Sequence, residues 1–385
     1  MPKSPLQDAA AIVGIAQSEF AKHLEPSEQE LAAKVVVEAL FDAGIDPSEV
    51  DAMCSLSMES TEEVAIASNI GAGDLTFFSQ VGYGGGGGCA TVGHCAMAVA
   101  TGQATVAVAW RARKRGSGPR PWAKTSGELA IPGRWTRPFG LIRPVDEIAM
   151  LTRRYMHTYG ATREHLANVA IAARFHANRN PKATMHDRTL TRDEYFSSRW
   201  ISEPLCLFDN CLESDGAVAV VVVSADRAKD CRNKPAYVHS FAQGLPRQSQ
   251  SMVNFFCDDP LKGPAWACAR KLWANAEIGP QDVDVAQIYD AFTPLVLLSL
   301  EGYGFCPRGE AGGFTEDRNL EWGVGRLPIN TSGGSLSEAY VHGFNLITEG
   351  VRQIRSTSTS QVEGAKTCLV TSGEGVPTSA ILLRG

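Results

Sequence analysis

Several features are scarce or absent in this 385-residue sequence, and each absence excludes a class of protein. The longest uninterrupted apolar run, residues 217–223, is far too short to cross a bilayer. The first residues, MPKSPLQDAA, contain no signal-peptide core. The formal net charge of -6 gives no overall basic field for nucleic acid. We therefore expect a cytoplasmic protein that neither spans a membrane nor binds nucleic acid.

Motifs typical of metal sites, nucleotide-binding sites and hydrolase active sites are also absent from the sequence. The 10 cysteines form no C-x-x-C pair and no His/Cys cluster with zinc spacing, so we expect mostly buried, reduced thiols and no metal on this chain. The sequence has no G-x-x-x-x-G-K-[ST], H-E-x-x-H or G-x-S-x-G. The glycine run 84–88 formally contains G-x-G-x-x-G, but no acid for a ribose follows about 20 residues later. The run therefore favours a close approach of the backbone to a ligand or to another chain over a nicotinamide site.

The order of expected elements is typical of an α/β fold. Apolar and alternating runs predict strands, and a period near 3.6 or small residues predict helices. We expect strands at 10–15, 50–56, 74–81, 105–110 and 283–288, and helices at 27–40 and 89–101. Strand, loop, helix and strand follow one another around the glycine run, which indicates α/β architecture.

An internal repeat divides the chain into two similar halves. Residues 43–51 (AGIDPSEVD) resemble residues 276–284 (AEIGPQDVD), and both pass through an I-x-P turn into an expected strand. A second, looser echo is the spacing of Gly85-Gly86 from His94, which matches that of Gly333-Gly334 from His342. We predict halves at 1–230 and 231–385, with an inserted region at about 111–210.

The inserted region begins with a strongly basic stretch. Residues 111–154 hold 11 Lys/Arg against three acids. This excess fits either a solvated face or the binding of a ligand that carries phosphate.

Two tyrosines stand at positions that favour chemistry. Tyr289 follows the expected strand 283–288, and open α/β sheets place ligands beyond the carboxyl ends of their strands. Tyr340 follows the glycine pair 333–334 near the start of a helix that we expect to continue to about Arg355. Each could equally be a packed tyrosine with a satisfied hydroxyl.

Motifs along the whole chain resemble the thiolase superfamily, in the branch of sterol-carrier-protein thiolases and lipid-transfer-protein-like members. The residues that carry the resemblance are 162–172 (TREHLANVAIA), 204–217 with Asp209-Asn210-Cys211, 289–292 (YDAF), 298–306 (LSLEGYGFC), 327–334 (LPINTSGG) and 371–375. The resemblance implies duplicated βαβαβαββ halves in a layered αβαβα fold, a homodimeric core and acyl-CoA chemistry.

The departures from the thiolase pattern concern the catalytic groups. Where a thiolase carries its nucleophilic Cys, this chain has Ala90, and Cys89 is one residue away. The Gly-His-Pro loop reads Ala339-Tyr340-Val341, and the late Cys-x-Gly-x-Gly loop begins with Thr371. Without a thiolate there is no covalent acyl intermediate, so ordinary thiolysis is not expected.

Tyrosines at two lost catalytic positions resemble the thiolase-like aldolases of bacterial steroid side-chain degradation. That resemblance implies retro-aldol cleavage of a β-hydroxyacyl-CoA, expected here to be a 17-hydroxy steroid C22-CoA that yields a 17-keto steroid and propionyl-CoA. The reaction needs a proton relay at the alcohol and donors at the thioester oxygen. We predict Tyr289 and Tyr340 as the acid/base pair, in roles that the sequence leaves open. Asp290 is predicted to order a tyrosine or a water, and His342 either polarises the site or is structural.

The resemblance also implies partners and binding residues. We expect a small DUF35-type partner with an OB fold and a zinc ribbon, giving a heterotetramer, with any zinc on the partner and no tightly bound cofactor here. Arg111, Arg113, Lys114 and Arg115 are candidates for contacts with coenzyme A. Phe77, Phe78, Trp122 and Trp135 are candidates for a steroid site, or ordinary packing residues. A non-catalytic lipid or acyl-CoA carrier and an atypical thiolase or acyltransferase are the alternatives.

Overall fold

One large sheet runs through the computed structural model, which describes residues 4–118, 133–248, 252, 254 and 257–385. Within these residues nine strands pair in the order β3-β2-β4-β7-β1-β8-β11-β10-β9. The strands are β1 (Ala10–Gln17), β2 (Ala52–Leu56), β3 (Phe77–Val81), β4 (Val106–Lys114), β7 (Asp215–Ser224), β8 (Ala236–Gly244), β9 (Val285–Gln287), β10 (Thr367–Thr371) and β11 (Thr378–Arg384). A separate two-stranded sheet contains β5 (Trp200–Ser202) and β6 (Leu205–Cys206). The mixed α/β architecture predicted from the sequence is therefore present.

The strand pairing repeats between the two parts of the chain. In the first part β7 lies antiparallel between β1 and β4, and β4 is parallel to β2. In the second part β11 lies antiparallel between β8 and β10, and β10 is parallel to β9. The two sets join through the antiparallel pair β1 and β8. The chain passes from one set to the other between β7 and β8, whereas the predicted boundary at 230/231 itself stays a prediction.

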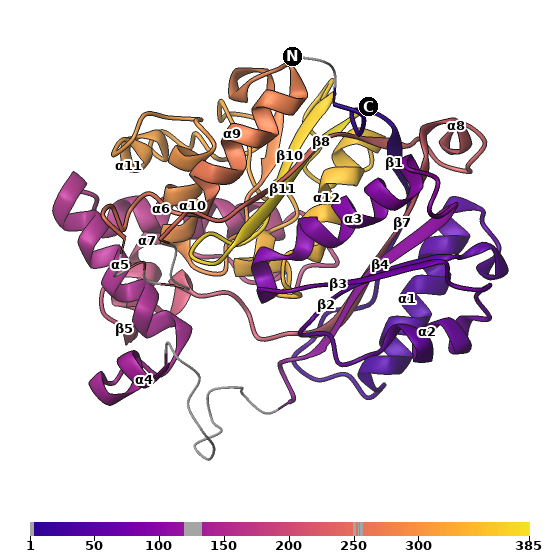
Figure 1. The fold of residues 1–385 in the computed structure, drawn as a ribbon. Helices are drawn as coiled ribbons and strands as arrows, with labels where there is room; N and C mark the ends of the chain where they lie inside the picture. The colour runs from indigo at the N-terminus through magenta and orange to yellow at the C-terminus, as the bar shows by residue number, and fades with distance from the viewer. Residues whose placement is uncertain (1–3, 119–132, 249–251, 253, 255–256) are drawn as a thin grey trace.

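Five layers follow from the way each strand divides its side chains. Alternate residues of β7 face two different cores, with Val221 among the side chains packed around helix α1 and Val220 among those packed around helix α3. Helices α3 and α12 contact strands of both sets and lie between them, whereas α1 covers the outside of the first set and α9 the outside of the second (Figure 1). The arrangement is the layered αβαβα order expected from the sequence.

The helices have the following bounds: α1 (Glu28–Ala43), α2 (Glu63–Ile70), α3 (Gly88–Ala100), α4 (Gly133–Thr136), α5 (Pro144–Tyr159), α6 (Arg163–Ala177), α7 (Arg192–Ser197), α8 (Ala225–Ala228), α9 (Pro264–Ala276), α10 (Thr293–Gly302), α11 (Ala311–Phe314) and α12 (Phe344–Arg355). None of the described helices is long and apolar enough to cross a membrane. A capping box begins α1, in which Ser27 and Glu30 each accept a backbone N–H of the other residue, and Gly44 ends it with φ of 75°.

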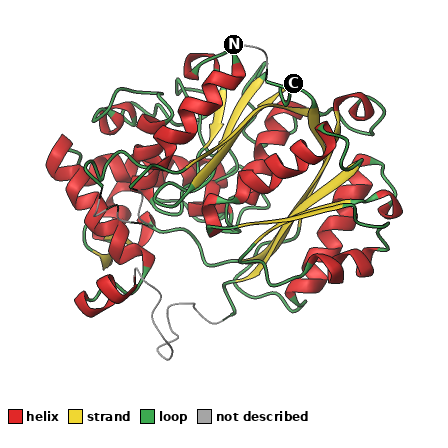
Figure 2. Ribbon diagram, viewed as in Figure 1, coloured by secondary structure: helices red, strands yellow, loops and turns green. Residues whose placement is uncertain are grey.

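The strand predicted at 105–110 runs on to Lys114, past the point near residue 111 where we expect the inserted region to begin. Arg111, Arg113 and Lys114 still belong to β4, where their backbones pair with β7. Helices α4 to α7 come next in the chain, and they lie together on one side of the molecule (Figure 2). Helix α6 packs against α10, α11 and the turn Gly334–Glu338. The inserted helices therefore contact elements from the C-terminal part of the chain.

Candidate active site

The hydroxyl oxygens of Tyr289 and Tyr340 lie 2.9 Å apart and share a hydrogen bond. Their ring centroids are 6.3 Å apart in an edge-to-face arrangement. Tyr289 follows β9, and Tyr340 lies in the loop before α12, so residues 51 positions apart meet between the sheet and a central helix. Tyr289 is 4% exposed, whereas Tyr340 is only partly buried. The two tyrosines that the sequence singled out therefore form one hydrogen-bonded pair.

Glycines make room for the ring of Tyr289. A Cβ on Gly85 would lie 1.9 Å from the Tyr289 hydroxyl oxygen, and a Cβ on Gly343 would lie 2.9 Å from its ring. Gly373 closes a third side, and its N–H donates to the carbonyl of Gly85 at 2.9 Å. The glycine run therefore allows a close approach, and at Gly85 the approaching group is the Tyr289 side chain of the same chain. An approach to a ligand or to another chain stays a prediction.

The segment around Tyr340 is not helical, which corrects the prediction that a helix runs from there to about Arg355. A π-helical turn spans Gly334–Glu338, Ala339 is extended with φ of -170°, and α12 starts only at Phe344. His342 has φ of 54° and precedes Gly343, whose φ is 82°. Two successive left-handed residues break the helix, so Tyr340 and His342 are free to lie on the same side. Their ring centroids are 5.1 Å apart.

Asp290 holds this loop rather than either phenol. Its Oδ1 accepts the backbone N–H of Ser335 at 2.7 Å, and its Oδ2 accepts that of Leu336 at 3.3 Å. The side chain is completely buried, and burial raises its pKa to about 6 despite these hydrogen bonds. Asp290 is therefore a positioning residue that ties the loop after β9 to the turn before Tyr340.

Both phenols are neutral at physiological pH. Burial, together with the adjacent Tyr340, holds the pKa of Tyr289 well above its usual value. Burial and Cys211 also raise the pKa of Tyr340, although the Tyr289 hydroxyl and the nearby arginines act in the opposite direction. A preformed phenolate base is therefore not available on either residue.

His342 is also held by a buried ion pair, that of Arg111 with Glu59. Its Nδ1 accepts from Nε of Arg111 at 3.0 Å, and Nη1 of Arg111 donates to Oε2 of Glu59 at 2.9 Å. Burial and the positive charge of Arg111 hold the pKa of His342 well below its usual value. Glu59 belongs to no recognisable sequence motif and was not predicted as a site residue.

The predicted CoA-binding residues have different environments. Arg111 is fully buried in the ion pair described above. Lys114 Nζ donates to the carbonyl of Leu24, and Arg113 Nη1 lies 4.0 Å from Glu28 Oε1. Arg115 lies near enough to Tyr340 to lower the pKa of that phenol. The contacts of these residues with CoA stay a prediction.

Other members of the basic and aromatic sets lie elsewhere. Arg120, Trp122 and Lys124 lie outside the described residues. Phe78 on β3 is 72% exposed and Trp135 on α4 is 65% exposed, whereas Phe77 packs against the core. Exposed positions on separate elements do not by themselves form a steroid pocket.

The positions of the two thiolase cysteines carry no nucleophile. Ala90 is buried in α3, and burial raises the pKa of the neighbouring Cys89 thiol to about 12. The hydroxyl oxygen of Thr371 accepts the backbone N–H of Tyr289 at 3.0 Å. A residue that replaces a cysteine of the thiolase pattern thus positions a tyrosine of the pair.

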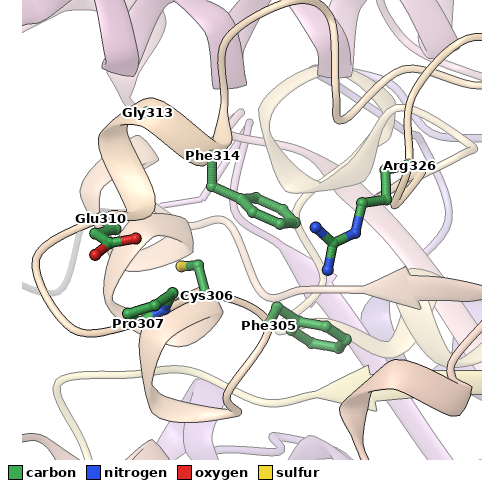
Figure 3. A pocket seen from close by; sticks show the side chains of 7 residues that line it. All are labelled: Phe305, Cys306, Pro307, Glu310, Gly313, Phe314 and Arg326. Atoms are coloured by element: carbon green, nitrogen blue, oxygen red, sulfur yellow. The ribbon is translucent and has the colours of Figure 1, made fainter.

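A pocket of about 480 Å³ is lined by residues other than those of the tyrosine pair. It is lined by Phe305, Cys306, Pro307, Glu310, Gly313, Phe314 and Arg326 (Figure 3). It lies beyond the C-terminal end of α10, whereas Tyr289 precedes the first turn of that helix. A helix of 10 residues is about 15 Å long, so this pocket is separate from the tyrosine pair.

Comparison with known proteins gives matches along the full chain. The family described as Thiolase C-terminal domain-like matches residues 249–383. The 17-hydroxy-3-oxo-4-pregnene-20-carboxyl-CoA lyase of Mycobacterium tuberculosis is 46% identical over 385 residues, covering 98% of this chain and 100% of that protein. The steroid side-chain-cleaving aldolase of Thermomonospora curvata is 46% identical over 387 residues, covering 99% of each.

A solved structure agrees with these relatives. The complex named Ltp2-ChsH2(DUF35) aldolase contains a chain that is 46% identical to this one, with a TM-score of 0.95. The match covers 99% of both chains. The similarity therefore extends over the whole fold, including the segments that carry the tyrosine pair.

Proposed function

Because the chain belongs to the family of steroid side-chain-cleaving aldolases on a thiolase fold, we propose that it cleaves a 17-hydroxy steroid C22-CoA thioester into a 17-keto steroid and propionyl-CoA. The protein is a carbon–carbon lyase that acts on CoA-linked steroid side chains. In the proposed reaction the bond between the carbinol carbon and the α-carbon of the thioester breaks. The hydroxyl proton leaves, the carbinol becomes the ketone, and the α-carbon gains one proton.

The hydrogen bond between Tyr289 and Tyr340 is the observation that carries this mechanism. Because both phenols are neutral, neither can act as a base unless it releases its own proton at the same time. A hydrogen-bonded pair can do so, since one oxygen accepts a proton while the other donates one. The pair thus links the alcohol to the α-carbon without a phenolate.

We propose one direction for this relay. Either hydroxyl can be the donor in the hydrogen bond between the two tyrosines, and we take Tyr289 as that donor. Tyr289 then receives the hydroxyl proton and passes its own proton to Tyr340. Tyr340 delivers its proton to the α-carbon of the departing enolate, and both phenols end neutral.

Product analysis tests the proposal directly. Incubation with a 17-hydroxy steroid C22-CoA thioester should give the ketone and propionyl-CoA in equal amounts without added CoA. A requirement for free CoA would instead indicate thiolysis, which the buried, protonated Cys89 disfavours. Binding without any product would indicate a carrier.

The assembly is a further part of the proposal. A DUF35-type partner is supported by the named complex of the 46%-identical chain, with any zinc on that partner. We place a homodimer contact at β3, because this strand lies at one end of the sheet and exposes Phe78. A cytoplasmic location is supported by the 10 cysteines, none of which forms a disulfide bond within the described part of the chain.

A further inference from the structure

Arg111 is a buried cation that donates hydrogen bonds to protein groups, one of which is His342 beside the tyrosine pair. The side chains of Arg111 and Glu59 are 0% and 1% exposed. Besides its bonds to His342 and Glu59, Arg111 Nη1 donates to the carbonyl of Met58 at 3.0 Å, and Nη2 has no acceptor among the described residues. Burying an ion pair is costly, and an unsatisfied N–H adds to that cost. Stability alone therefore does not explain the arrangement.

The bond from Arg111 fixes the proton of His342. A guanidinium only donates hydrogen bonds and keeps its protons, so Nδ1 of His342 must be the acceptor. In a neutral imidazole the single proton then resides on Nε2. His342 is 6% exposed, and its Nε2 has no hydrogen-bond partner among the described residues.

The position of the His342 imidazole indicates which group its Nε2–H can reach. The imidazole packs edge to face on Tyr340, one member of the relay, with an interplanar angle of 83°. The carbonyl of His342 lies 3.0 Å from where a Cβ of Gly88 would be, at the start of the central helix α3. The donor is thus next to the tyrosine that protonates the α-carbon, and the thioester oxygen is two bonds from that carbon.

We propose that Glu59 and Arg111 lock His342 as its Nε2–H tautomer, and that this N–H donates a hydrogen bond to the thioester oxygen of the substrate. The inference rests on the proposed aldolase function, because that reaction places an enolate at the thioester. A fixed donor is worth most where charge develops, since the N–H needs no reorientation during the reaction. Glu59 and Arg111 are positioning residues that act through His342.

The groups around the imidazole are consistent with a neutral ring. Strand β4 and its end present Arg111, Arg113 and Arg115, all of which oppose protonation. Glu59 lies behind Arg111 and is paired with it. The ring of Tyr340 packs against the imidazole as a neutral phenol, and Tyr289 is hydrogen-bonded to Tyr340. Cys211 interacts with both phenols, and burial raises the pKa of its thiol to about 12.

Kinetics of two variants test the role of the lock. His342→Leu should lower kcat about 100-fold with little change in KM, the signature of an interaction made in the transition state. Arg111→Met should lower kcat similarly at pH 8, where the freed imidazole can adopt either tautomer. As the pH falls to 6 its kcat should rise relative to wild type, because an imidazolium carries a proton on both nitrogens. The double variant should show no such rise.

A matched control separates this effect from loss of a buried arginine. The Arg355 side chain is 7% exposed, pairs with Asp42, and donates to the carbonyl of Val13. Arg355→Met should retain wild-type kcat and pH dependence. Equal losses in the Arg355 and Arg111 variants would overturn the proposal, as would an Arg111→Met profile parallel to that of wild type.

A spectroscopic measurement reports on the tautomer without activity. In protein labelled with ¹⁵N-histidine, the His342 signals, assigned by their loss in His342→Leu, should show a protonated Nε2 and an unprotonated Nδ1 from pH 6 to 8. A proton on Nδ1 would overturn the inference even in an active aldolase. Absence of aldolase activity in protein with the Nε2–H tautomer would instead refute the proposed function and leave the lock standing.

Discussion

The carboxylate of Asp290 accepts the backbone N–H of Ser335 at 2.7 Å, and this contact joins the two loops that carry Tyr289 and Tyr340. Tyr289 is the residue before Asp290, and Tyr340 is five residues after Ser335. The distance between the two hydroxyls is therefore set by a hydrogen bond that involves neither tyrosine side chain.

Asparagine at position 290 should weaken the hydrogen bonds that join the two loops. Asp290→Asn keeps an acceptor for one N–H, but it turns a donor toward the other, Ser335 or Leu336. We expect kcat to fall by about 10- to 100-fold, since a misplacement near 1 Å can cost about 100-fold, with the fold retained. Steady-state kinetics and circular dichroism check this, and an unchanged kcat would show that the loop needs no such anchor.

Removal of either phenolic oxygen should stop the relay. Tyr289→Phe and Tyr340→Phe should each lower kcat by about 100- to 10,000-fold, because each deletes a proton-transfer group, while CoA-ester binding persists. Calorimetric binding and product formation measure the two effects separately. Near wild-type turnover in either variant would remove that residue from the mechanism.

Hydrogen exchange tests whether the two phenols act together. Because a neutral phenol can take up a proton only while it releases its own, the wild type should exchange the α-hydrogens of propionyl-CoA in D₂O, and both Tyr289→Phe and Tyr340→Phe should lose this exchange. Proton NMR of the recovered thioester provides the measurement. Exchange at the wild-type rate in either variant would show that the remaining phenol acts without its partner.

A methyl group at position 85 should displace Tyr289 without altering any polar residue. In Gly85→Ala the new Cβ would meet the Tyr289 oxygen at 1.9 Å, which forces the ring to move. We expect a loss of turnover on the order of 100-fold. Gly82→Ala is the matched control, since nothing lies within 4 Å of its Cβ. Similar activity in both variants would mean that the position of Tyr289 is not critical.

The buried carboxyl of Glu374 should make stability depend on pH. Burial raises its pKa from 4.5 to about 8, and Ala265 N–H is its hydrogen-bond donor at 2.7 Å. Because the folded state holds this proton more tightly, the stabilisation is complete below about pH 4.5 and is lost as the pH rises through 8. A difference of one in pKa is worth about 1.4 kcal/mol, so the loss amounts to a few kcal/mol.

Glu374→Gln should flatten this dependence by keeping the acceptor and removing the ionisation. Thermal unfolding at pH 6 and pH 9 should show a smaller decrease in Tm for the variant than for wild type. Glu316→Gln, at a side chain that is 59% exposed, is the control and should behave as wild type does. An unchanged decrease in the Glu374 variant would contradict the assignment.

An acidic residue on the edge strand should disrupt self-association. Phe78 is 72% exposed on β3, at one end of the sheet, and Phe78→Asp would bring two like charges together in a contact between copies. We expect a smaller species by analytical ultracentrifugation with the secondary structure unchanged. An unaltered assembly would place the dimer contact on another surface.

The sequence predicted the parts of the site that depend on local pattern. Tyr289 and Asp290 follow a strand recognisable from its apolar run, although β9 is shorter than predicted at Val285–Gln287. The loop of Tyr340 was wrongly predicted as helix, because the left-handed residues His342 and Gly343 delay the helix until Phe344. The turn before this loop is held by Asp290, which is 45 residues away from Ser335 in the sequence. The role of Arg111 also depends on a distant residue, Glu59, that only the tertiary structure brings near. Contacts of this kind leave no periodicity in the sequence.

The position of α3 and α12 between the two strand sets has a consequence for folding cooperativity. In the described part of the chain each set packs one apolar face on these shared helices, and β1 and β8 hydrogen-bond across the junction. A half produced alone would expose that face to water and would be prone to aggregate. The repeat therefore does not correspond to two autonomous folding units, and unfolding should proceed as one transition that dismantles the tyrosine pair together with the sheet.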